Sequence, residues 1–120
     1  MVMVIPYVAA QSINDDGHLF SNLKFSANLA VTTDTTLTVP GISPRYKAII
    51  KCEQAGVVWV ANNAVAAAPA GASFASTTSE LITEDNTLNR EVKAGDVLHF
   101  FSTAANVEVS VVFYSLYAPN

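Results

Sequence analysis

The chain has 120 residues, of which 51% are hydrophobic and only 13% are charged, and its net charge is −4. This length predicts a single domain with a substantial core, and six basic residues spread along the sequence are too few to neutralise a phosphate backbone. A nucleic acid is therefore not expected as a partner. A membrane is not expected either, because no apolar segment is long enough to cross a bilayer.

Residues 1–10 read MVMVIPYVAA and predict an extended arm or first strand that precedes the domain at residues 11–120. An apolar run on both faces needs cover on both faces, which a neighbouring subunit would supply to an arm; the alternative is an ordinary core strand. One face would carry Met1, Met3, Ile5 and Tyr7, and the other Val2, Val4 and Val8. The segment lacks the basic n-region of a signal peptide and is interrupted by Pro6. We therefore expect no signal peptide, and a cytosolic origin.

Residues 14–17, Asn-Asp-Asp-Gly, predict a turn before the most regular alternation in the chain. One predicted strand face is apolar and the opposite face is polar, which is typical of a half-buried strand. The apolar face comprises Leu23, Phe25, Ala27, Leu29 and Val31, and the polar face Asn22, Lys24, Ser26 and Asn28. A short strand is expected over residues 35–39, ended by Pro40 and Gly41.

Two further strands are expected over residues 46–54 and 57–61, and the turn at Ala55-Gly56 predicts that they form a hairpin. The first places Tyr46, Ala48, Ile50 and Cys52 on one face. Cys52 is the only cysteine, so no internal disulfide forms, and a small buried residue is favoured over a nucleophile. Trp59 lies within the apolar run of the second strand, which favours core packing.

Residues 62–78 are rich in alanine, but Pro69 and Gly71 would interrupt a helix. We expect a close-packed loop with a short strand near Phe74. Small side chains such as Ala67 would allow close approach at a subunit contact, while a tolerant surface loop is the plainer interpretation.

The rest of the chain predicts more short strands. Residues 79–82 favour a strand or a single helical turn, and residues 88–92 a strand. The turn at residues 93–96 and the Ala104-Ala105-Asn106 segment lead into strands at 97–101 and 107–117. About eight short strands with turn residues at regular spacing predict an all-β fold, a single antiparallel β-sandwich or jelly-roll-like domain.

The sequence offers little for catalysis, and we expect neither an enzyme nor a cofactor. It has no glycine-rich phosphate loop, metal-binding histidine or cysteine pair, or nucleophile elbow. His99 within an apolar strand favours a half-buried histidine with one hydrogen bond, and Asp96 favours bonding to its own turn. His18 with Asp15 and Asp16 lacks the ligand spacing of a calcium loop.

A surface so poor in charge and rich in Thr, Ser, Asn and Ala suits contact with other chains. A robust or secreted β-domain simply rich in these residues is an equally open interpretation. A platform of Trp59, Tyr46, Tyr114 and Tyr117 for sugar stacking is the alternative to core packing of Trp59.

Several motifs resemble those of small virion structural proteins of tailed bacteriophages, over roughly residues 45–117. They are the Val-Val-Trp-Val-Ala-Asn run at 57–62, Ala-x-x-Pro-x-Gly at 66–71, Thr-Ser-Glu-Leu at 78–81, Arg-x-Val-x-Ala-Gly-Asp at 90–96 and Val-x-Val-x-Phe-Tyr at 109–114. The motifs are structural, and residues 1–44 have no counterpart in the resemblance.

The resemblance implies a non-enzymatic protein of the phage head surface, made in the host cytoplasm. It would decorate or cement the capsid as a homo-oligomer, often a trimer in such proteins, by binding the major capsid protein or other virion proteins. The alternative is a head- or tail-fibre component that binds a carbohydrate receptor. The expected capsid or subunit contacts are Met1, Val2, Met3, Val4, Ile5, Tyr7, Ala67, Pro69, Tyr114 and Tyr117.

Overall fold

The computed structural model describes residues 21–53 and 56–116 and shows eight β-strands in them. The strands are β1 (Lys24–Leu29), β2 (Thr35–Thr38), β3 (Arg45–Cys52), β4 (Val57–Asn62), β5 (Ser79–Thr83), β6 (Leu88–Lys93), β7 (Val97–Phe101) and β8 (Val107–Ser115). The predicted arm at residues 1–10, the turn at 14–17, His18 and Tyr117 lie outside the described residues.

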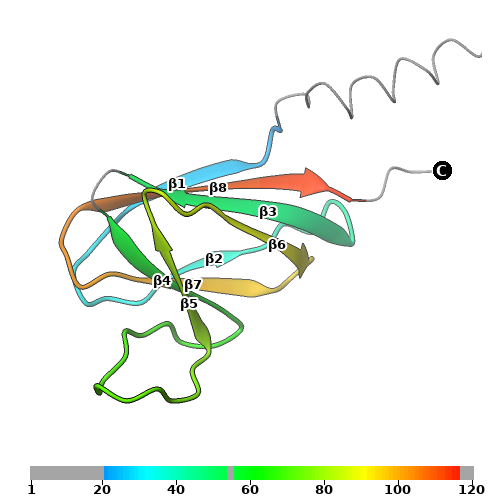
Figure 1. Ribbon diagram of the computed structural model, residues 1–120. Coiled ribbons are helices and arrows are strands. Elements are labelled where there is room, and N and C mark those ends of the chain that lie inside the picture. The colour runs from blue at the N-terminus through cyan, green and yellow to red at the C-terminus, as the bar shows by residue number, and fades with distance from the viewer. Residues whose placement is uncertain (1–20, 54–55, 117–120) are drawn as a thin grey trace, which may run out of the picture.

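The strands form two antiparallel four-stranded sheets, with the orders β1-β8-β3-β6 and β2-β7-β4-β5 (Figure 1). Pairs β1–β8, β2–β7, β3–β6 and β4–β5 are those of one long antiparallel hairpin rolled into two layers. This is the strand order of a jelly roll, so the predicted all-β sandwich is confirmed.

The predicted hairpin between residues 46–54 and 57–61 is wrong. β3 pairs with β6 and β8 in one sheet, while β4 pairs with β5 and β7 in the other. The short connection that includes Gly56 therefore crosses from one layer to the other. A connection short enough for a hairpin is equally compatible with a change of sheet, because both begin with a sharp turn of the chain.

Inward-facing side chains of both sheets form one hydrophobic core. On β3 these are Tyr46, Ala48, Ile50 and Cys52, all buried as the alternation predicts. The Phe113 ring packs edge-on against Tyr46, with centroids 5.7 Å apart, and the Tyr46 hydroxyl accepts a hydrogen bond from the Ser43 amide. The polar end of a buried tyrosine is thus satisfied, as burial requires.

β1 differs from the prediction of a half-buried strand. Of its apolar row, Leu29 is buried, but Phe25 is 36% exposed and Ala27 is also exposed. The reason is position: β1 is the edge strand of its sheet and β2 is the edge strand of the other. A groove of about 360 Å³ separates these two edges and reaches core residues Phe100, Val109 and Val111.

β4 and β5 are joined by residues 63–78, called the alanine-rich loop below, which extends beyond the sandwich (Figure 1). It contains no strand, so the predicted strand near Phe74 is wrong. Phe74 is fully exposed and Ala66 is buried. The segment is therefore an exposed loop anchored at one alanine, closer to the surface-loop interpretation.

Candidate binding surfaces

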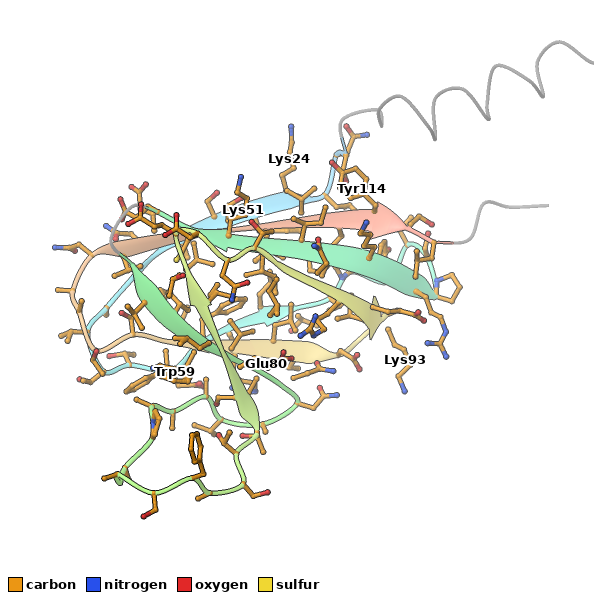
Figure 2. All side chains as sticks on the ribbon, in the orientation of Figure 1. Lys24, Lys51, Trp59, Glu80, Lys93 and Tyr114 are labelled. Atoms are coloured by element: carbon orange, nitrogen blue, oxygen red, sulfur yellow. The ribbon has the colours of Figure 1, made fainter. Side chains whose placement is uncertain are left out.

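The outer face of the β1-β8-β3-β6 sheet combines apolar and basic side chains, and we call it the lysine-bearing face. Strand register aligns Lys24 with Val112 and Ile49, and Lys47 with Tyr114. Ile49, Val112 and Tyr114 are half-buried along its centre, while Lys24, Lys47 and Lys51 are exposed around them. Figure 2 shows Lys24, Lys51 and Tyr114 on the same outer side of this sheet.

The charge of this face is opposite to that of the whole chain, which is −4. Register places five cations on it, against three carboxylates, those of Glu91, Glu108 and, just past the end of β3, Glu53. The cations are Lys24, Arg45, Lys47, Lys51 and Lys93. Arg45 contacts Glu91 at 2.7 Å. Basic residues spread along the sequence thus converge on one surface. The spacing of Arg45, Lys47 and Lys51 by two or four residues is the sequence feature that places them on one face of a strand.

The opposite outer face, on the β2-β7-β4-β5 sheet, carries an apolar patch that we call the tryptophan face. Trp59 lies directly between Phe101 on β7 and Leu81 on β5. Leu81 is 40% exposed and Val57, also on β4, 39% exposed. The prediction that Trp59 packs in the core is wrong: its neighbours Val58 and Val60 point inward and Trp59 points outward.

The aromatic platform that the sequence left as the alternative does not form from its three described members, Trp59, Tyr46 and Tyr114. Tyr46 is fully buried in the core, and Tyr114 lies on the lysine-bearing face. Figure 2 shows Tyr114 and Trp59 on opposite sides of the sandwich. The ring beside Trp59 is Phe101.

The alanine-rich loop covers the next row of the same sheet, formed by His99, Ala61 and Ser79. Ser79 Oγ accepts a hydrogen bond from the Ala67 amide at 3.1 Å. Asp34 accepts one from the Ala66 amide at 3.2 Å and contacts His99 Nδ1 at 2.7 Å. The prediction of a half-buried His99 with a hydrogen bond is confirmed, and the pair fixes the loop to the sheet.

A second anchor is the turn between β6 and β7. The Asp96 carboxylate accepts hydrogen bonds from the Lys93 amide and from the side chains of Asn62 and Asn63. Burial alone would raise the pKa of Asp96, but these hydrogen bonds outweigh it and hold the pKa below its usual 3.8. The prediction that Asp96 bonds its own turn is confirmed, and it also ties the end of β4 to that turn.

Cys52 is buried, and burial, with the charges of Glu84 and Glu53, raises the pKa of its thiol, so it remains protonated near neutral pH. Among residues 21–53 and 56–116, no three His, Cys, Asp or Glu side chains group as a metal site.

Of the predicted contact residues inside the described range, Tyr114 lies on the lysine-bearing face, while Ala67 and Pro69 are exposed on the alanine-rich loop. These sites belong to opposite sides of the molecule. Trp59, Phe101 and Leu81 were missed as surface residues, since the run at 57–61 is apolar on both faces and gives no sign of which face is inside.

No protein-family model, no curated protein and no solved structure matches this chain. In the part of the chain that the structure describes, no helix has the length and apolar character needed to cross a membrane.

Proposed function

We propose that the protein is a non-enzymatic structural component of a phage virion that decorates or cements the head, as a homo-oligomer such as a trimer. The observation that carries the proposal is the presence of apolar patches on both outer faces of one small sandwich. Trp59 and Phe101 lie on one side, and Ile49, Val112 and Tyr114 on the other. A small domain that contacts neighbouring subunits on two sides would bury both patches. Jelly rolls are also frequent in viral capsid proteins.

The lysine-bearing face is the side proposed to meet the particle. Its exposed lysines suit an acidic partner surface, and its half-buried apolar centre supplies area to bury. Burial contributes roughly 25 cal/mol per Å² of apolar area before association costs are subtracted. β1, the first strand after the arm in the sequence, is an edge strand of this same sheet.

Particle binding tests the proposal. Purified protein is added to particles stripped of it, and occupancy is measured by sedimentation and gel densitometry. The wild-type chain is expected to bind. A chain lacking residues 1–10 is expected to bind at least tenfold more weakly, while its circular dichroism spectrum shows that it remains folded. A deletion that binds at full occupancy would remove the arm from the contact, and a wild-type chain that never binds would refute the decoration role.

Outward placement of Trp59 gives specific support to a second candidate, a fibre component that binds a carbohydrate. A tryptophan beside a second aromatic ring on an open sheet face suits stacking on a sugar. Jelly rolls also serve as lectin domains.

A glycan array separates the two candidates. If the protein binds sugar through the tryptophan face, Trp59→Ala abolishes the signal while Tyr114→Ala, on the opposite face, retains it. Absence of any signal for the wild-type protein would eliminate this second candidate.

A further inference from the structure

We propose that residues 2–8 of the same chain form an additional strand on the open edge of β1 and close the groove between β1 and β2. The groove is lined by apolar side chains that include Phe25, Ala27 and Leu37. Phe25 packs edge-on against the core residue Phe113, with centroids 5.8 Å apart, yet remains 36% exposed. A core-facing row left open in this way indicates a missing covering element.

The open edge has a defined polarity. The carbonyl of Leu23 accepts a hydrogen bond from the Phe113 amide, so Leu23 directs its backbone toward β8. Because backbone direction alternates along an antiparallel strand, Phe25 and Ala27 also face β8, and Ser26 and Asn28 present their amides and carbonyls to the open edge. A strand added there must bond to Ser26 and Asn28.

The sequence before β1 fits this requirement. A four-residue hairpin loop at residues 14–17, ending in Gly17, would set Ile13 opposite His18. With the pairing kept in step past the bend at Asn22, this count would put Ile5 opposite Ser26 and Met3 opposite Asn28, the two residues with backbone groups at the edge.

Pro6 then lies opposite Phe25, at a position whose backbone nitrogen points away from β1. A proline has no amide hydrogen, so this is the register in which Pro6 costs no hydrogen bond. Had the register been shifted by one residue, Pro6 would have faced the β1 backbone without a donor.

The same register sorts the side chains of the added strand. Residues opposite one another share a face, so Val2, Val4 and Val8 lie over Leu29, Ala27 and Leu23 and enter the groove. Met3, Ile5 and Tyr7 join Ser26 and Asn28 on the outer side, where they extend the lysine-bearing face. Both apolar rows of the segment then have a place.

Disulfide trapping tests the pairing in the isolated protein, independently of any particle binding. Val4 and Ala27 would form a non-hydrogen-bonded pair with Cα atoms about 4.5 Å apart, within disulfide range. Val4→Cys with Ala27→Cys, in a Cys52→Ala background, is expected to oxidise within one chain. Ile5→Cys with Ala27→Cys is the control, because its two sulfurs would lie on opposite faces.

Peptide mass spectrometry and non-reducing gels read the result. The Val4/Ala27 pair is expected to close at least tenfold faster than the Ile5/Ala27 pair and to give a monomer. Equal closure of both pairs would overturn the register. Disulfide-linked dimers whose yield rises with protein concentration would show that a second copy supplies the strand and would overturn the same-chain assignment.

Hydrogen exchange of full-length variants provides a second test that needs no cysteine. Val4→Asp would place a carboxylate in the apolar groove, while Ile5→Asp would face outward. The amides of Ser26 and Asn28 are expected to lose at least tenfold protection in Val4→Asp and to keep it in Ile5→Asp, with Val109 and Val111 on β8 unchanged. Equal protection of Ser26 and Asn28 in the two variants would contradict the added strand.

Discussion

At Gly56, the crossing from β3 to β4 leaves no room for a side chain. A Cβ atom there would lie 2.8 Å from Val107 Cγ1 and 2.9 Å from the carbonyl oxygen of Glu53. The Glu53 oxygen also accepts a hydrogen bond from the Gly56 amide, so it is held in place. The close approach of the two layers at this point depends on the missing side chain.

Gly56→Ala is therefore expected to lower the free energy of unfolding by about 1–3 kcal/mol, since a backbone oxygen cannot move aside as a flexible side chain does. Urea unfolding at neutral pH measures the loss. Gly71→Ala is the matched control, because a Cβ at Gly71 meets nothing within 4 Å. It should leave stability unchanged or raise it slightly, and an equal loss in both variants would disprove the steric explanation.

Asp96 connects stability to pH. Its carboxylate has a lowered pKa in the folded protein and a usual one in the unfolded chain, so ionisation favours folding. This contribution is fully present above the unfolded value of 3.8 and is lost as pH falls through the lower folded value.

Asp96→Asn is expected to destabilise the protein by about 1–2 kcal/mol at pH 7, because the charged acceptor of three hydrogen bonds is replaced by a neutral one. The difference from wild type should shrink as the pH is lowered below 3.8. Urea unfolding of both proteins from pH 7 to pH 2 tests this, and a difference independent of pH would exclude the carboxylate as its source.

At the scale of elements, the alanine-rich loop is attached to the sheet beneath it by Asp34. Asp34→Ala removes the acceptor of the Ala66 amide and the partner of His99. We expect a loss of about 1–3 kcal/mol and faster cleavage by elastase, which cuts after small residues. Thr36 is exposed on the adjacent β2, so elastase should cleave the Thr36→Ala variant at the wild-type rate. If elastase cleaves the Asp34→Ala variant at that rate too, Asp34 does not anchor the loop.

The strands themselves follow from alternation and turn residues, and the buried row of β3 from Tyr46 to Cys52 is predicted correctly. Partnership between strands is not local information, which is why the hairpin at Gly56 is wrong. The prediction that Trp59 packs in the core is wrong for a related reason. Its neighbours in the sequence are also apolar, so the alternation of side chains along the strand does not show which face is the inner one. Exposure of Phe25 depends on β1 lying at a sheet edge, which only topology reveals.

At the scale of the whole molecule, the sandwich separates charge between its two sides. The lysine-bearing face has a positive excess within a chain of net charge −4. Attraction between exposed charges is screened by salt over about 8–10 Å at physiological ionic strength. Attachment through this face should therefore weaken as salt is added.

Lys47→Glu combined with Lys51→Glu is expected to reduce particle binding at least tenfold at low salt, with a smaller difference at 0.5 M NaCl. Leu81→Ser, on the tryptophan face, should bind as the wild type does. Occupancy measured over a salt series reports the effect. Binding lost in Leu81→Ser and retained in the double lysine variant would reverse the proposed orientation.

The alanine-rich loop lies on the side of the sandwich opposite the lysine-bearing face and, among the connections from β1 to β8, is the one that joins consecutive strands of the same sheet. A foreign peptide inserted at Gly71 would interrupt no strand pairing and touch no core residue. The fold thereby offers a display scaffold, in which an epitope would be carried outward while the opposite surface stays available for attachment.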